Sequence, residues 1–150
     1  MIGAGVVLAL QVMVQSTENI SAKTVQTVPQ VTETKSLIDY EEVDLLAHLI
    51  YAEANTLGER GMQYAGSVVL NRVSDESFPD SIRDVIMQVN QYACVTNGSI
   101  WDEPSDVAYE IAEELIIYGS VLPKSCVYQA EFPQGSSTYL TIGNTYICTK

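Results

Sequence analysis

The chain has 150 residues, of which 19 are acidic and 7 are basic, so its formal net charge is −12 at pH 7. This length fits one domain, and hydrophobic residues make up 47% of the chain, which is enough for a packed core. The acidic balance argues against nucleic acid as a partner, because binding there depends on Lys and Arg neutralising phosphates. It also disfavours binding to anionic membrane surfaces.

Residues 1–15 have the character of a signal peptide or membrane anchor. The run from Ile2 to Val14 is apolar apart from Gln11 and carries no charge, and it is short for a membrane span. No Lys or Arg precedes the run and no clear cleavage site follows it, so the segment could also remain as an anchor. Residues 16–40, rich in Ser, Thr, Val and Gln, are predicted as a flexible linker. We therefore expect an exported protein, at the cell wall or the outer face of the membrane, with residues 41–150 as its folded domain.

Four segments have the apolar spacing of helices: Glu41–Ala54, Met62–Val73, Ile82–Gln88 and Asp106–Tyr118. The first has acidic residues in its opening turn, and the segment 55–61, with two glycines, is expected to break it from the second. In the second, Gly66 and Ser67 are small enough for a neighbouring element to approach closely. Ser81 and Asp84 have the spacing of a capping box before the third helix.

The chain changes character after Pro123. Before this point, residues 91–102 are predicted as a polar loop. After it, three segments are rich in Tyr, Thr, Val and Ile, as strands are: Val127–Glu131, Ser137–Ile142 and Thr145–Thr149. Gly143-Asn144 between the last two is a hairpin signal. The predicted class is α+β: a mostly helical domain with a small C-terminal antiparallel sheet.

One carboxylate, Glu53, stands where helical spacing calls for an apolar side chain. Leu46, Leu49 and Ile50 precede it by seven, four and three residues and share its face in a helix. Burial disfavours the charged form of a carboxyl group, and a carboxyl group that keeps its proton can deliver it to a leaving group. On spacing alone, however, a glutamate that turns to solvent is the commoner outcome.

Most other chemistries lack support in the sequence. Phosphate-cradling loops and the serine nucleophile motif are missing, and one His with scattered Cys does not make an ordinary zinc site. His48 lies about 140° round the helix from Glu53, so a core or surface role is expected for it rather than a catalytic one. Cys126 and Cys148 could meet if their strands pair, and Cys94 is expected to be an ordinary buried thiol.

A set of short motifs then occurs in a fixed order: LAHLIYAEA at residues 46–54, VVLNRV at 68–73, FPDSI at 78–82, VI at 85–86, QY at 91–92 and VTNGSI at 95–100. In order and spacing they resemble the cell wall hydrolase family of the spore cortex-lytic enzyme SleB. The resemblance extends from Glu42 to the C-terminus, where residues 141–146 are similar to the family's closing hairpin.

The resemblance implies a lysozyme-like domain that cleaves peptidoglycan glycan strands between N-acetylmuramic acid and N-acetylglucosamine. Glu53 matches the motif glutamate. In lytic transglycosylases, which the family resembles in action, one carboxyl group protonates the glycosidic oxygen and then accepts a proton from the muramoyl 6-hydroxyl, which closes a 1,6-anhydro ring. Such a reaction requires no metal, cofactor or second acid. We expect a monomer whose partner is the glycan strand.

Six residues are candidates for substrate binding: Asn71, Arg72, Gln91, Tyr92, Tyr128 and Tyr139. Asn71 and Arg72 could equally cap a helix and hold a neighbouring loop, and tyrosines on strands are more often packing residues. Family members more often have Pro-Gly where this chain has Val89-Asn90, which puts the shape of that loop in question.

Three alternatives stay open. A retaining or inverting hydrolase needs a second acid about 5 to 9.5 Å from the first, for which Glu59, Asp75, Glu103 and Glu131 are available. A module that binds peptidoglycan without cleaving it is the second, motivated by the altered loop and the short chain. An amidase is the third and weakest.

Overall fold

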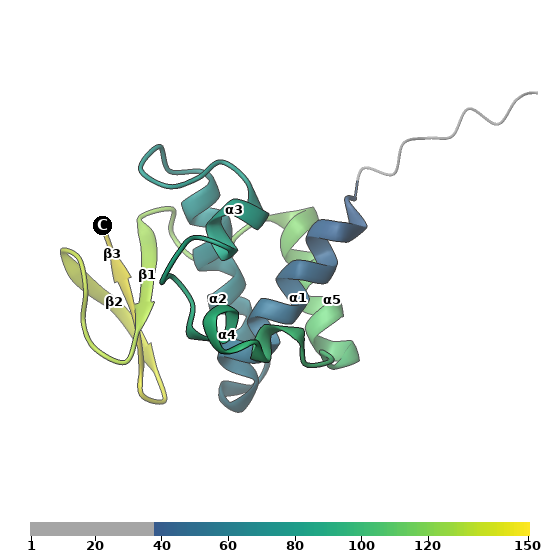
Figure 1. The fold of residues 1–150 in the computed structure, drawn as a ribbon. Helices are drawn as coiled ribbons and strands as arrows, with labels where there is room; N and C mark the ends of the chain where they lie inside the picture. The colour runs from purple at the N-terminus through teal and green to yellow at the C-terminus, as the bar shows by residue number, and fades with distance from the viewer. Residues whose placement is uncertain (1–37) are drawn as a thin grey trace, which may run out of the picture. The chain divides into compact units, whose positions relative to one another are not determined.

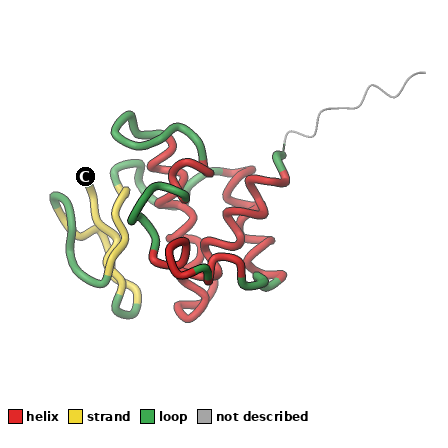
Figure 2. The backbone as a smooth tube through the Cα atoms, in the orientation of Figure 1, coloured by secondary structure: helices red, strands yellow, loops and turns green. Residues whose placement is uncertain are grey.

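The computed structural model describes residues 38–150, whose helices are gathered beside a three-stranded sheet (Figures 1 and 2). The helices are α1 (Tyr40–Ala54), α2 (Gly58–Val73), α3 (Ile82–Ile86), α4 (Ala93–Asn97) and α5 (Asp106–Tyr118), with 3₁₀ turns η1 (Asn55–Leu57) and η2 (Ser99–Trp101). The strands are β1 (Cys126–Ala130), β2 (Ser137–Ile142) and β3 (Thr145–Thr149). The predicted α+β class is confirmed. The predicted leader at 1–15, and the linker at 16–40 up to residue 37, lie outside the described residues.

Helix α1 begins and ends within one residue of the prediction. The Asp39 side chain caps it by accepting a hydrogen bond from the Glu41 backbone N–H at 3.0 Å. Glu41 and Glu42 in the first turn complement the positive end of the helix dipole. Its apolar face enters the core, and Figure 1 shows α1 beside α5, with α2 between these helices and the sheet.

Helix α2 begins four residues earlier than predicted, because Gly58 turns the chain at a φ of +71° and the helix follows at once. The expected close approach at Gly66 is confirmed: a Cβ there would lie 2.4 Å from Leu115 Cδ1 of α5. Ser67 is fully buried, and its hydroxyl accepts a hydrogen bond from the Val121 backbone N–H at 3.0 Å. The two small residues let α5 and the segment after it pack directly on α2.

The segment between α3 and α5 is more helical than predicted. Ser81 caps α3 as expected, accepting from the Asp84 N–H at 3.1 Å. The expectation of a polar loop over residues 91–102 is wrong, because α4 and η2 form there. Cys94 and Ile100, 4% and 0% exposed, bury these short turns against the other helices. Such segments are too short to show helical periodicity, and tertiary packing stabilises them.

The sheet has the strand order β1-β3-β2, and both pairs are antiparallel. The predicted hairpin is confirmed, since Ile142 pairs with Thr145 across Gly143-Asn144, where Gly143 has a φ of +53°. A second buried cluster joins sheet to helices and contains Val68, Leu122, Cys126 and Ile147. Within residues 38–150, no helix is long and apolar enough to cross a bilayer.

Candidate active site

Glu53 lies in the last turn of α1, where the helix leaves the core. Leu46, Leu49 and Ile50, which share its side of the helix, are completely buried, whereas Glu53 itself is partly exposed. Its neighbour Ala54 is 1% exposed. The carboxylate therefore lies at the edge between the apolar core and solvent, as the spacing predicts.

The thiol of Cys94 lies close enough to Glu53 for the carboxylate to affect its pKa. Cys94 is the second residue of α4 and is 4% exposed. Burial first, and then the neighbouring Glu53 carboxylate, raise the pKa of the thiol to about 12. Cys94 is therefore protonated at neutral pH. Sequence reasoning expected the buried thiol but missed its proximity to Glu53, because α4 was not anticipated.

The Tyr92 hydroxyl lies within the electrostatic reach of both Glu53 and Arg72. Burial raises the pKa of Tyr92 to about 12, an effect that Glu53 reinforces and the Arg72 charge opposes. The phenol is thus neutral over the physiological range. It accepts a hydrogen bond from Arg72 Nη1 at 3.1 Å, which leaves its own proton available to another acceptor.

Arg72 holds the segment that carries Tyr92. Its guanidinium is 3% exposed, donates from Nε to the Val127 carbonyl at 2.7 Å, and lies over the rings of Phe78 and Tyr92, 5.2 and 5.6 Å from their centres. The Gln91 amide oxygen, turned toward the guanidinium, accepts from Nη1 at 2.8 Å and from Nη2 at 3.2 Å. One buried cation thereby connects α2, β1 and the loop before α4.

Asn71, the residue before Arg72, also connects α2 to β1 and to the segment before that strand. It is 2% exposed, and its amide nitrogen donates to the carbonyls of Pro123 and Cys126 at 2.8 and 2.9 Å. Sequence reasoning offered Asn71 and Arg72 two roles, substrate contact or holding a neighbouring segment. The observed hydrogen bonds are of the second kind.

The loop with Val89-Asn90 keeps a tight turn. The Gln91 N–H donates to the Gln88 carbonyl at 3.0 Å, and Asn90 has a φ of +62°. Asn is the residue that, after Gly, best tolerates this left-handed conformation. Asn90 therefore adopts a backbone geometry that glycine favours, and Gln91 and Tyr92, both partly exposed, follow it and contact Arg72.

The two strand tyrosines differ in exposure. Tyr128 on β1 is half-buried, edge-on to Phe78 at 6.4 Å between ring centres, and a Cβ at Gly135 would lie 2.8 Å from its ring. It packs as strand tyrosines commonly do. Tyr139 on β2 is 51% exposed.

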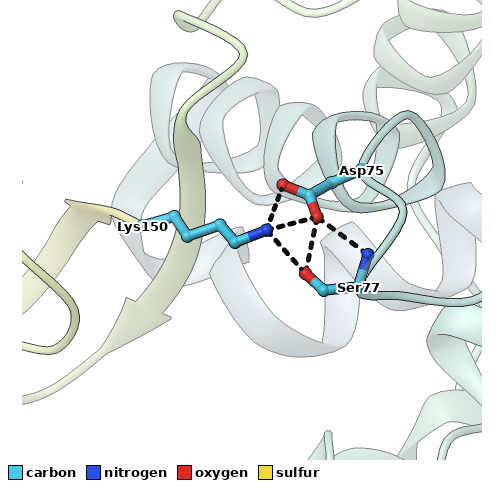
Figure 3. A network of polar contacts seen from close by, with 3 residues as sticks. All are labelled: Asp75, Ser77 and Lys150. Atoms are coloured by element: carbon cyan, nitrogen blue, oxygen red, sulfur yellow. Dashed lines mark hydrogen bonds and ion pairs between the residues drawn. The ribbon is translucent and has the colours of Figure 1, made fainter.

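Asp75, one of the candidate second acids, forms an ion pair with Lys150, the residue that follows β3 (Figure 3). The Lys150 ammonium contacts its two carboxylate oxygens at 2.8 and 3.1 Å, and the Ser77 hydroxyl at 2.9 Å. Hydrogen bonds from Lys150 and Ser77 lower the pKa of Asp75 to about 2. The other three candidates, Glu59, Glu103 and Glu131, are exposed.

His48 lies away from this cluster of contacts. Its Nε2 is 4.0 Å from Asp44, one turn earlier on α1, and its ring lies beside Trp101 at 6.0 Å between centres. In residues 38–150, no group of three His, Cys, Asp or Glu is arranged to hold a metal ion.

Cys126 and Cys148 are buried free thiols. Their strands do pair, but Cys126 is opposite Thr149 and Cys148 is opposite Tyr128. The register shifts between Cys126 and Tyr128, and the two cysteines are not directly opposite each other.

The chain is similar to known cell wall hydrolases. A model of the cell wall hydrolase family matches residues 57–141, more than half of the chain. The chain is 33% identical over 75 residues to a spore cortex-lytic enzyme of Oceanobacillus iheyensis. The aligned segment covers 50% of this chain and 27% of that enzyme. It is 34% identical over 79 residues to the cell wall hydrolase CwlJ of Bacillus subtilis. Here the aligned segment covers 50% of this chain and 56% of that protein. The match thus spans about a quarter of the first relative and just over half of the second.

Two solved structures share the fold. The catalytic domain of Bacillus cereus SleB superposes with a TM-score of 0.64 at 22% identity, covering 74% of this chain and 91% of that domain. The catalytic domain of the germination-specific lytic transglycosylase SleB from Bacillus anthracis gives 0.64 at 21% identity, covering 75% and 97%. The expected similarity to the SleB fold is confirmed. Glu53 lies four residues before the segment that the family model matches.

Proposed function

This chain belongs to the cell wall hydrolase family, and on that premise we propose that it cleaves peptidoglycan glycan strands between N-acetylmuramic acid and N-acetylglucosamine, with Glu53 as its general acid and base. The observation that carries the proposal is a partly buried carboxylate at the end of α1, whose charge acts on the buried Cys94 thiol and on the Tyr92 hydroxyl. It lies in a fold shared with SleB catalytic domains.

In the first step, the protonated Glu53 gives its proton to the oxygen that leaves the muramic acid C1. Glu53 is partly exposed at the end of α1, so its carboxyl group is accessible to a glycan strand at the surface. Breaking the C1–O bond leaves positive charge on the sugar ring, which the carboxylate that has just formed stabilises.

In the second step, the same carboxylate accepts a proton from the muramoyl 6-hydroxyl, whose oxygen bonds to C1. The product carries a 1,6-anhydro end, and the two proton transfers need only one carboxyl group. This lytic transglycosylase route is preferred over a hydrolase with two acids, because Asp75 is bound to Lys150 and Ser77. Glu59, Glu103 and Glu131 have exposed side chains.

Gln91 and Tyr92 are also proposed to contact the substrate. Both hydrogen-bond to Arg72 and both are partly exposed, so each can still meet a sugar at the surface. The tight turn at Asn90 also weakens the case for a module without activity, which rested on an altered loop. Tyr128 and Tyr139 on the sheet are proposed as further substrate contacts, and Asn71 and Arg72 hold β1 and the Tyr92 segment in place. Because the glycan lies outside the cytoplasmic membrane, the proposed function requires export.

The direct test is Glu53→Gln, which keeps the shape of the side chain and removes the proton transfer. We expect the variant to fold normally, to bind purified walls and to release no soluble muropeptides. Glu110→Gln, an exposed glutamate on α5, is the matched control and should act like the parent protein. A Glu53→Gln variant that releases muropeptides at the parent rate would overturn the proposal. Release by neither parent nor control, with wall binding intact, would favour the binding module.

A further inference from the structure

An exposed tryptophan lies outside the part of the molecule that the proposed cleavage uses. Trp101, the last residue of η2, is 62% exposed. Exposure alone means little, because single apolar side chains are common at protein surfaces. Two further features set Trp101 apart: its backbone is held rigidly, and polar side chains that are themselves oriented lie beside its ring.

The backbone around Trp101 is fixed by hydrogen bonds and by packing. The Trp101 N–H donates to the Gly98 carbonyl at 3.1 Å. The N–H of the next residue, Asp102, donates to the Ser99 carbonyl at 3.1 Å. The residue before it, Ile100, is completely buried, and η2 packs against α1. A rigid aromatic side chain loses little conformational entropy when it binds a partner, so this ring suits a binding surface.

Three side chains continue the surface from the ring of Trp101. The ring lies tilted beside that of His48, with 6.0 Å between their centres. His48 Nε2 is 4.0 Å from Asp44 Oδ1, and the Asp44 side chain is 58% exposed. Asp44 also accepts a hydrogen bond from the Tyr109 hydroxyl at 3.1 Å, which orients its carboxylate. We call these four residues, contributed by α1, η2 and α5, the Trp101 surface.

The Trp101 surface has the chemistry that recognises a sugar. One face of a pyranose ring carries C–H groups, which pack on an aromatic plane, and its edge carries hydroxyl and acetamide N–H donors, which a carboxylate accepts. The exposed carboxylate of Asp44 and the net charge of −12 disfavour an anionic ligand. An N-acetylhexosamine carries no charge of its own and fits both conditions.

This surface is separate from the candidate active site. His48 and Glu53 are five residues apart on α1, so they lie about 7.5 Å apart along the helix axis and about 140° apart around it. A glycan strand is a polymer, and neighbouring strands lie close together in a wall. Peptidoglycan can therefore meet Trp101 and Glu53 at the same time, although they lie on different sides of the helix.

We propose that Trp101 and Asp44 form a second glycan-contact surface, which binds an N-acetylhexosamine ring of peptidoglycan away from the bond that is cleaved. A second contact on the same polymer raises the concentration of the active site at the wall without taking part in the chemistry. The inference rests on the proposed function, which makes peptidoglycan the substrate. Binding at this surface can be measured without any cleavage, so the two can fail separately.

Binding is tested by fluorescence, because Trp101 is the only tryptophan in the chain and reports on its own surroundings. The Glu53→Gln variant is titrated with soluble glycan strands from which the stem peptides have been removed. We expect a saturable change in emission, with a Kd roughly threefold to tenfold higher when Asp44→Asn is added, since a charged acceptor is lost. Adding Glu110→Gln instead, an exposed glutamate elsewhere on α5, should leave the Kd unchanged.

Three results of this titration would overturn the proposal. The first is an emission that does not change with glycan. The second is a change that follows protein concentration alone, which would make Trp101 a contact between copies of this chain. The third is an Asp44→Asn variant that binds as tightly as its parent.

The contribution to cleavage is tested with Trp101→Ala on insoluble walls. We expect KM to rise roughly threefold to tenfold with kcat unchanged, because an aromatic contact is lost away from the reacting bond. Trp101→Phe keeps a smaller ring and should lie between. Tyr118→Ala, which removes another exposed aromatic ring at the end of α5, is the matched control and should keep the parent KM.

An unchanged KM in Trp101→Ala would overturn the proposal. A fall in kcat would overturn it as well, because it would place the ring at the cleaved bond. If the parent protein releases no muropeptides, the proposed function fails, and the fluorescence titration still decides whether the Trp101 surface binds glycan.

Discussion

Replacement of Arg72 by Lys separates the two roles that sequence reasoning left open for this residue. Lysine keeps the positive charge but has one ammonium group in place of the planar fork. It cannot donate to Val127, Tyr92 and Gln91 with the geometry of the guanidinium, whose bonds to them measure 2.7, 3.1 and 2.8 Å. It also loses the flat contact with the Phe78 and Tyr92 rings.

The expected cost follows from these contacts. Loss of the bond from Nε to the Val127 carbonyl, which is buried, is worth about 1.5 to 3 kcal/mol because the donor is charged. Weaker stacking on the two rings adds about 0.5 to 1 kcal/mol. We therefore expect Arg72→Lys to lower the free energy of unfolding by about 2 to 4 kcal/mol. For a domain of this size each kcal/mol lowers Tm by roughly 4 °C, so the fall should be about 8 to 16 °C.

The assay is urea unfolding followed by circular dichroism, together with kcat and KM on peptidoglycan for the folded variant. A structural clamp predicts a large loss of stability, with a fall in activity that follows the disorder of Gln91 and Tyr92. If Arg72→Lys is as stable as the parent and only KM rises, the guanidinium contacts substrate instead and the reasoning is wrong.

Three further predictions follow from other parts of the fold. Asn90→Ala should lose about 1 kcal/mol in urea unfolding because alanine is strained at a φ of +62°, whereas Asn90→Gly should be neutral or stabilising; a neutral alanine would mean that the turn is not left-handed. Gly66→Ala should lose about 1 to 3 kcal/mol, because its new Cβ would lie 2.4 Å from Leu115 Cδ1, and increased stability would show that the helices are farther apart. Bonds from Lys150 and Ser77 lower the pKa of Asp75 from 3.8 to about 2, so the interaction stabilises the fold above about pH 4 and is lost as the pH falls through 2. The Tm of Lys150→Ala should thus be lower than that of the parent at pH 7 and approach it below pH 2, where Asp75 is protonated; a difference that is undiminished below pH 2 would assign the effect to packing.

The long elements of this fold were predictable from sequence. Helices α1 and α5 and strands β2 and β3 have clear periods and clear ends, such as the Gly143-Asn144 turn, and their bounds agree with prediction to within a residue. Residues 91–102 were not predictable in the same way. The burial of Cys94 and Ile100 stabilises α4 and η2, and this long-range packing leaves no periodic signal in so short a stretch.

In the candidate site too, features set by local spacing were predictable and contacts between distant segments were not. The position of Glu53 at the core edge follows from spacing within one helix, and the spacing predicted it. The buried contacts of Arg72 depend on a strand 55 residues away, and the burial of Cys94 depends on an unpredicted helix. Such contacts are set by tertiary packing, and no local pattern encodes them. Substrate contact by Gln91, Tyr92, Tyr128 and Tyr139 stays a prediction.

The central claim is that Glu53 alone serves as acid and base in glycan cleavage. Mass spectrometry of the products from purified peptidoglycan tests it most directly. The account predicts muropeptides with 1,6-anhydro ends from the parent protein and none from Glu53→Gln. Reducing sugar ends would show that water attacks the glycan and that a second acid must take part, which would contradict the mechanism with a single carboxylate.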